Sequence, residues 1–120
     1  MVVDDDEMVA KTVARIVGRR LLGAEVRMVH SVREAIGEIE RGFDPKLIFC
    51  DMMMPELTGM DFLDYIQKNR SEMESRIRFM SGGATTPKTQ EFLESLGSKL
   101  IRKPFGNGDI QKPLDEVFGK

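Results

Sequence analysis

The sequence predicts an α/β fold, an open doubly wound sheet of five parallel strands with helices on both faces. Three observations lead to this prediction. Short apolar segments alternate five times with longer segments in which apolar residues recur at helical spacing. The segment 47–50 is apolar throughout, which is typical of a central strand covered on both faces. The chain has 120 residues, enough to bury one core.

The first strand and helix are clearly marked. Residues 1–3 are apolar and precede an acidic run, 4–7. The next segment repeats apolar residues at helical spacing and stops at Gly23, a residue type that commonly ends helices. A second strand is expected over 24–30, which is rich in β-branched and apolar residues. The apolar face of this first helix consists of Val9, Val13, Ile16, Val17 and Leu21.

Two further helices surround the central strand. Ser31 is a good N-cap with a glutamate three residues later, the pattern of a capping box, so a helix is expected to begin there. Pro45 marks a loop before the strand 47–50, and Pro55 and Gly59 lie in the loop before the third helix. The apolar faces of the two helices consist of Val32, Ala35, Ile36, Ile39 and Phe43, and of Phe62, Leu63 and Ile66.

The last third of the chain completes the alternation. Residues 76–81 form the predicted fourth strand, a helix opened by proline spans 87–96, and residues 98–103 form the fifth strand. Asp109 is expected to cap the final helix. Pro113 would then fall near the fourth helical position, at the limit of what a helix start tolerates, so we expect this helix to begin late.

The composition of the chain argues against a nucleic-acid-binding protein and against a membrane-spanning one. Charged residues make up 32% of the chain with a net charge of −2, which argues against a nucleic-acid-binding surface. No apolar run approaches the roughly 18 residues of a membrane span, and no signal-peptide pattern is present. The single cysteine, Cys50, fits a reducing compartment, so we expect a cytoplasmic protein. A strand pattern that begins at Met1 suggests that residues 1–120, one domain, come from a longer chain.

Chemically active residues follow several of the predicted strands. Asp4 and Asp5 follow the first strand, Asp51 the third, Ser81 ends the fourth and Lys103 the fifth. The carboxyl ends of parallel strands meet at one edge of the sheet, where ligands bind in such folds. Three close carboxylates repel one another unless a divalent cation such as Mg²⁺ or Mn²⁺ binds them. A carboxylate beside a cation, a lysine and a hydroxyl can attack a phosphoryl group.

The chain resembles the receiver domain of two-component response regulators over its whole length. The segments that carry the resemblance are "VVDDDE", "LIFCDMMMPELTGMDF", "IRFMSGG" and "IRKPF", in the order of the family. The resemblance implies a flavodoxin-like (βα)5 fold with strand order 2-1-3-4-5. It also implies a phosphoacceptor that takes its phosphoryl group from a histidine kinase or a histidine phosphotransfer domain and catalyses only its own transfer and hydrolysis.

The resemblance also assigns the metal ligands. Asp51 matches the phosphoacceptor, and Asp4 and Asp5 match the acidic pair, with Asp5 on the ion directly and Asp4 largely through water. The backbone carbonyl of Met53 matches a further ligand. Asp51 completes this set, which binds Mg²⁺ or Mn²⁺.

A second group matches the residues that bind the phosphate. Ser81 and Lys103 match the hydroxyl and ammonium groups, and the backbone N–H of Gly82 matches a further donor. Pro104 follows the lysine where the family often has a cis peptide. The family implies a homodimer through the fourth helix, fifth strand and fifth helix.

The sequence departs from the family at three positions. Leu100 stands where the family has an aromatic switch residue, so a Ser81-driven shift of the loop 82–87 is the expected response. Met53 and Gly83 replace polar side chains that align hydrolytic water in other members, so we expect a long-lived acyl phosphate.

Two other functions remain open, as does the parent chain. An unphosphorylated receiver-like module would only bind partner proteins. An aspartyl phosphatase would need an acid two residues after the nucleophile, where Met53 stands. The segment 80–105 looks most like receivers at the C-terminus of hybrid sensor histidine kinases, so we expect that origin.

Overall fold

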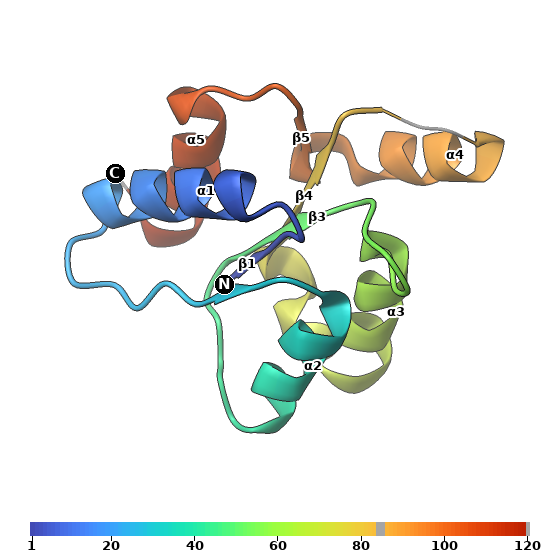
Figure 1. Ribbon diagram of the computed structural model, residues 1–120, viewed down its shortest axis with the longest axis horizontal. Helices are drawn as coiled ribbons and strands as arrows, with labels where there is room; N and C mark the ends of the chain where they lie inside the picture. Colours follow the sequence, from blue (N-terminus) through green and yellow to red (C-terminus); the bar gives the residue numbers. More distant parts are fainter. Residues whose placement is uncertain (84–85, 120) are drawn as a thin grey trace.

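The computed structural model describes residues 1–83 and 86–119, and its centre is one parallel sheet (Figure 1). Five strands lie in the order β2-β1-β3-β4-β5, all parallel, which confirms the flavodoxin-like order 2-1-3-4-5. The strands are β1 (Val2–Val3), β2 (Met28–Val29), β3 (Ile48–Asp51), β4 (Ile77–Ser81) and β5 (Leu100–Arg102).

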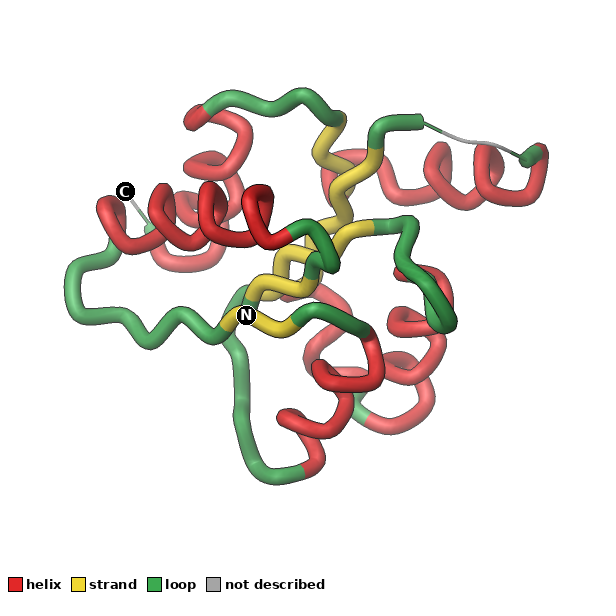
Figure 2. Tube along the Cα trace, in the orientation of Figure 1, coloured by secondary structure: helices red, strands yellow, loops and turns green. Residues whose placement is uncertain are grey.

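Helices connect the strands and cover both faces of the sheet (Figure 2). Helices α1 and α5 pack side by side on one face, and α2 and α3 lie on the other. Helix α4 joins the α2–α3 face through Leu93. The helices are α1 (Glu7–Arg20), α2 (Val32–Glu40), α3 (Gly59–Asn69), α4 (Pro87–Leu96) and α5 (Asn107–Phe118), with short 3₁₀ helices η1 (Ser71–Arg76) and η2 (Gly97–Lys99).

Side chains of the central strands alternate between two hydrophobic clusters. Phe49 and Met80 face α1 and α5, whereas Cys50 and Phe79 face the other helices. All four are buried, because successive side chains of a strand point to opposite faces and both faces are covered. The fully apolar segment 47–50 is therefore the central strand that the sequence predicted.

The helix starts follow their predicted chemistry in most places. The Ser31 hydroxyl accepts the N–H of Glu34 at 3.0 Å, so the predicted N-cap of α2 is confirmed, whereas the Glu34 carboxylate accepts the His30 N–H at 3.4 Å instead of completing a capping box with Ser31. Thr58 caps α3 and Asp61 accepts the Thr58 N–H at 2.8 Å, a full capping box. These bonds satisfy N–H groups that a helix start otherwise leaves without partners.

The prediction of a late start for the last helix was wrong. Helix α5 begins at Asn107, and Asp109 lies inside its first turn, where its carboxylate accepts the Gly106 N–H at 2.9 Å. Pro113 sits within the helix and is buried. Its ring costs one backbone hydrogen bond, but Ile110 and Leu114 are 0% and 1% exposed, and their burial outweighs this cost.

Several strands are shorter than predicted. The predicted strand 24–30 contains β2 only at Met28–Val29, because its neighbour β1 offers just two residues to pair with. The predicted starts of the fourth and fifth strands fall in the 3₁₀ helices η1 and η2 instead. Within the described residues, no helix is long and apolar enough to cross a membrane.

Candidate functional site

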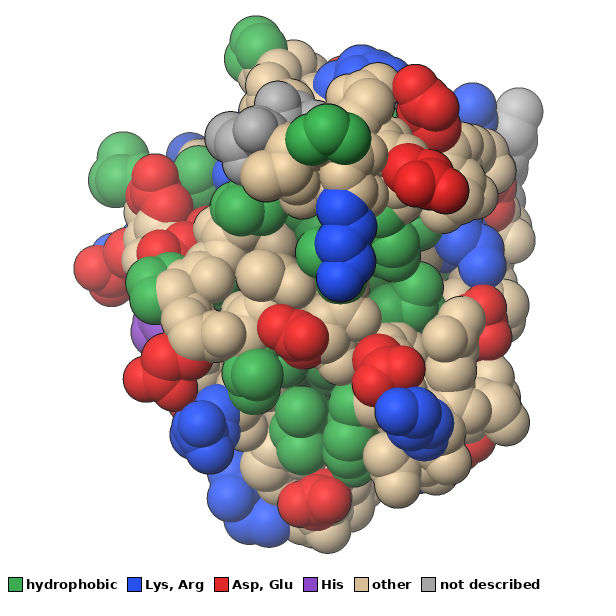
Figure 3. Space-filling view, turned by 90° about the vertical axis from the view of Figure 1, so that its right-hand side faces the viewer, with side chains coloured by type: hydrophobic (Ala, Val, Ile, Leu, Met, Phe, Trp, Pro, Cys, Tyr) green, Lys and Arg blue, Asp and Glu red, His purple; other side chains and the backbone are tan. Residues whose placement is uncertain are grey.

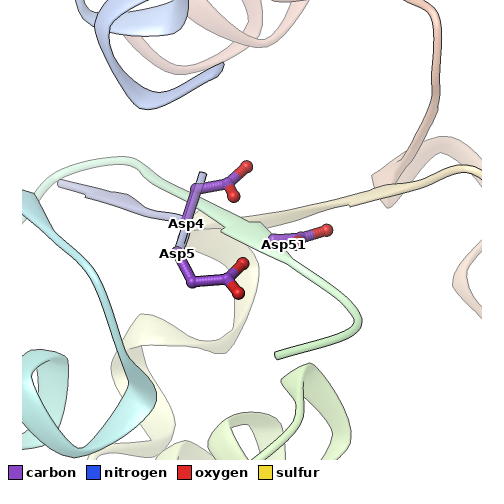
Figure 4. Close-up of side chains that lie close together, drawn as sticks. All are labelled: Asp4, Asp5 and Asp51. Atoms are coloured by element: carbon purple, nitrogen blue, oxygen red, sulfur yellow. The ribbon is translucent and has the colours of Figure 1, made fainter. Parts of the chain in front are cut away.

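The carboxyl edge of the sheet gathers the predicted site residues from separate strands (Figure 4). Asp4 and Asp5 follow β1, and Asp51 is the last residue of β3. Ser81 ends β4 and Lys103 follows β5, with the Lys103 N–H donating to the Ser81 carbonyl at 2.8 Å. Parallel pairing thus brings together residues that lie up to about a hundred positions apart in the chain.

Three carboxyl groups form the acidic part of the site. One oxygen each of Asp4, Asp5 and Asp51 lies within 4.8 Å of the other two, and the three side chains point the same way in Figure 4. Asp4 is fully buried and Asp51 is 8% exposed, whereas Asp5 lies at the surface. The sequence prediction that these acids converge is therefore confirmed.

The two oxygens of the Asp4 carboxylate have different surroundings: Oδ1 accepts a hydrogen bond, and Oδ2 lies 3.6 Å from the Lys103 ammonium without a hydrogen bond in the described part of the chain. Its Oδ1 accepts the backbone N–H of Asp6 at 2.9 Å, a contact that the sequence did not reveal because it depends on the turn after β1. Its Oδ2 is buried and makes no hydrogen bond within residues 1–83 and 86–119. A buried carboxylate oxygen that accepts no hydrogen bond from the described residues, beside two further carboxyl groups, fits a hard divalent cation such as Mg²⁺.

Lys103 supplies the positive charge of the site. Its Nζ donates to Asp51 Oδ1 at 3.1 Å and lies 3.6 Å from Asp4 Oδ2, an ion pair but too long for a hydrogen bond. Burial disfavours the charged lysine, but the carboxylates of Asp51 and Asp4 outweigh that effect and raise the pKa of Lys103. The lysine therefore stays protonated and can pair with an anion at Asp51.

The pKa values of both buried acids, Asp4 and Asp51, are raised. Burial raises the pKa of Asp51; the charge of Lys103 opposes the shift, and the Asp5 carboxylate adds to it. Burial also raises the pKa of Asp4; the Asp6 N–H opposes that shift, and the Asp51 carboxylate adds to it. The site thus disfavours its own negative charges until a cation joins them.

Ser81 lies at the edge, but its hydroxyl is turned to the following loop. Its Oγ accepts the Gly83 N–H at 3.1 Å and donates to the Gly83 carbonyl at 3.1 Å, while the side chain is 4% exposed. Gly82, the predicted phosphate donor, is an exposed residue between them. The loop 82–87 that we expected to shift includes residues 84 and 85, which lie outside the described residues.

The loop between β3 and α3 borders the acids. Met53 is 46% exposed two residues after Asp51, and Glu56 adopts a left-handed φ of 67°. Gly59 does not serve the turn that the sequence suggested. It begins α3, where its N–H donates to the Met52 carbonyl at 2.9 Å and where an added β-carbon would crowd the Phe79 ring and the Met52 backbone. The Lys103–Pro104 peptide is cis, as the resemblance implied.

Comparison with known proteins agrees with this geometry. A two-component response regulator of Oryza sativa, ORR3, is 25% identical over 118 residues, covering 97% of this chain and 88% of the relative. The receiver domain of Francisella response regulator 1452 has a TM-score of 0.75 at 22% identity and covers 98% of this chain and 93% of that one. Chemotaxis response regulator CheY4 of Vibrio cholerae has a TM-score of 0.73 at 23% identity, with coverages of 97% and 94%. These two structures share the fold.

The family assignment depends on the chain as a whole. Residues 1–115 match the family described as the response regulator receiver domain. That match includes the three acids, the serine and the lysine that the sheet brings to one edge. The chain therefore belongs to the response regulator receiver domain family.

Proposed function

We propose that the chain accepts a phosphoryl group on Asp51 from the phosphohistidine of a kinase or a histidine phosphotransfer domain. An oxygen of the Asp51 carboxylate attacks phosphorus, the bond from phosphorus to the histidine nitrogen breaks, and the imidazole leaves with the electron pair. The observation that carries the proposal is the buried Asp51 carboxyl group, 3.1 Å from the Lys103 ammonium and beside two further acids.

Asp4, Asp5, Asp51 and the Met53 carbonyl would hold Mg²⁺ or Mn²⁺, which supplies positive charge to offset the transferred group when bound. The chain's own residues do the rest. Lys103 pairs with the charge that arrives on Asp51, and the backbone N–H of Gly82 offers a donor at the end of β4. The Ser81 hydroxyl, which now donates to the Gly83 carbonyl, gains an alternative acceptor in a phosphoryl oxygen.

The face around the site suits contact with a protein donor. Viewed from the side that carries the loops after β3 and β4, the surface mixes hydrophobic, acidic and basic side chains (Figure 3). Met8 at the start of α1 and Met53, two residues after Asp51, are 73% and 46% exposed and provide apolar contact area close to the acids in the chain. We place this exchange in the cytoplasm, and a homodimer would use the face made by α4, β5 and α5.

Intact mass spectrometry tests the proposal. The chain is incubated with acetyl phosphate and Mg²⁺, beside the Asp51→Asn variant and a sample with EDTA. A mass gain of about 80 Da, the mass of one phosphoryl group, is expected only with Mg²⁺ in the unsubstituted protein, which is called the parent below. No gain in the parent would refute the proposal and favour a module that only binds partners.

A further inference from the structure

Two aromatic rings connect the backbone beside Asp51 to helix α4. Phe79 of β4 is fully buried, and its ring meets that of Phe92 in α4 edge to face, with centroids 5.9 Å apart and planes at 76°. This is a favoured geometry for an aromatic pair. Phe92 is partly buried and packs against the same cluster, beside Leu93 and Leu96 of α4. Because the two rings are in contact, a shift of one ring changes the packing of the other.

The Phe79 ring also lies close to the start of α3. A β-carbon added at Gly59 would lie 3.0 Å from Cδ1 and 3.1 Å from Cε1 of the Phe79 ring, and 3.2 Å from the Met52 Cα. Gly59 is bonded to the Met52 carbonyl, and Met52 directly follows Asp51. Close-packed groups without intervening space transmit displacement. Movement of the backbone after Asp51 thus presses on Phe79.

The sheet register places the Phe79 ring beside position 100, where this chain has leucine and the family has an aromatic residue. Leu100, which stands where the family has its switch residue, pairs with Phe79 in the neighbouring strand, so both side chains emerge on the same face. Ser81 lies two residues along β4 and shares that face. Phe79 therefore lies within reach of the Ser81 end of β4, the backbone after Asp51 and α4.

We propose that the contacts from Gly59 through Phe79 to Phe92 couple the Asp51 site to α4 and take the place of an aromatic residue at position 100. This inference rests on the proposed function, because phosphorylation of Asp51 is the event that it relays. Rearrangement of residues 52–58 around a phosphoryl group displaces the Phe79 ring. Phe92 then moves with it and changes the packing of α4.

The coupling is tested first without phosphorylation. Gly59→Ala places a methyl group against the Phe79 ring and the Met52 backbone, so one of them must shift. Hydrogen exchange followed by mass spectrometry is expected to show faster exchange of α4 amides, by roughly two- to tenfold, the factor that loss of an aromatic pair corresponds to. Exchange in α5, on the other face, serves as the internal reference for global unfolding.

The second arm uses acetyl phosphate and Mg²⁺ on the parent, Phe92→Leu and a control, Phe118→Leu. Phe92→Leu keeps an apolar side chain but removes the ring, and Phe118 lies 45% exposed at the end of α5, outside the contact. The expected result is a change of α4 exchange in the parent and control, reduced to less than about half in Phe92→Leu at equal phosphorylation. Equal phosphorylation is established by the intact mass.

The outcomes separate the inference from the proposed function. If Phe92→Leu shows the same α4 change as the parent, or if Gly59→Ala leaves α4 exchange unaltered in a folded protein, the coupling is refuted. If the parent gains no phosphoryl mass, the proposed function fails, and the Gly59→Ala arm alone decides whether the contacts couple the Asp51 loop to α4.

Discussion

Replacement of Asp4 by asparagine is expected to stabilise the protein without metal and to abolish its stabilisation by Mg²⁺. Asp4 is fully buried, and only one of its oxygens has a hydrogen-bond partner within the described residues. Its raised pKa shows that the folded state favours the neutral side chain, with burial as the main cause. Asparagine has the same shape, keeps the bond to the Asp6 N–H and carries no charge.

The magnitude follows from the charges around Asp4. At an effective dielectric constant of about 20, the Asp51 carboxylate, which lies within 4.8 Å, repels Asp4 by at least roughly 3.5 kcal/mol, and Lys103 at 3.6 Å attracts it by roughly 4.6 kcal/mol. These effects nearly cancel, which leaves the desolvation of a buried carboxylate and the screened charge of Asp5. We expect a net gain of about 1 kcal/mol in the free energy of unfolding for Asp4→Asn in EDTA, about 4 °C in Tm.

In Mg²⁺ the unsubstituted protein should be more stable than Asp4→Asn, the reverse of their order in EDTA. A ligand at a hundred times its Kd stabilises a folded protein by about 2.7 kcal/mol. The parent should gain this amount at saturating Mg²⁺, whereas the variant lacks the carboxylate and gains little. Thermal unfolding in EDTA measures the effect of the substitution without metal, and thermal unfolding in Mg²⁺ measures the stabilisation by the cation. Asp64→Asn, an exposed acid paired with Lys68 on α3, is the matched control and should follow the parent within about 0.5 kcal/mol.

Two results would contradict this reasoning. If Asp4→Asn unfolds at a lower temperature than the parent in EDTA, the buried carboxylate is stabilised by contacts that the charges and burial do not account for. If the variant gains as much from Mg²⁺ as the parent, the cation binds elsewhere.

Three other substitutions test separate parts of the site. Lys103→Gln removes the ammonium 3.1 Å from Asp51 and is expected to slow phosphorylation by acetyl phosphate about a hundredfold, followed by intact mass; a rate near the parent's would exclude its role. Thr58→Ala removes the cap of α3 and should lower the free energy of urea unfolding by about 1 kcal/mol, whereas an unchanged midpoint would show that the cap contributes nothing. Met53→Asn offers a hydrogen-bonding side chain beside Asp51 and should shorten the acyl-phosphate lifetime about tenfold by mass, unless water is aligned from elsewhere.

The sequence predicted the fold well because α/β alternation depends on patterns along the chain. The apolar segment 47–50 became a buried central strand, and Ser31 capped its helix as expected. Boundaries were less accurate where tertiary contacts decide them. Strand β2 is short because β1 limits its pairing, and α5 continues through Pro113 because Leu114 and its neighbours are buried against α1 and the sheet.

The convergence of the acids and the lysine was predictable, but their individual environments were not. Parallel pairing alone places Asp4, Asp51 and Lys103 at one edge of the sheet. Which oxygen of Asp4 has a partner depends on the turn that brings the Asp6 N–H back to it. Likewise, the bonds between the Ser81 hydroxyl and Gly83 depend on local loop geometry. A sequence pattern specifies such contacts only through the fold.

Gly59 illustrates why residue type alone can mislead about a residue's role. In the sequence, a glycine after a proline suggests a turn, and a turn would need a left-handed backbone or a tight reversal. In the structure the residue begins a helix, and an added β-carbon there would crowd the Phe79 ring and the Met52 backbone. The absence of a β-carbon thus allows close packing between the loop after Asp51 and the core. The coupling that we propose therefore lies one strand away from position 100, at the buried Phe79 ring that pairs with Leu100 across the sheet.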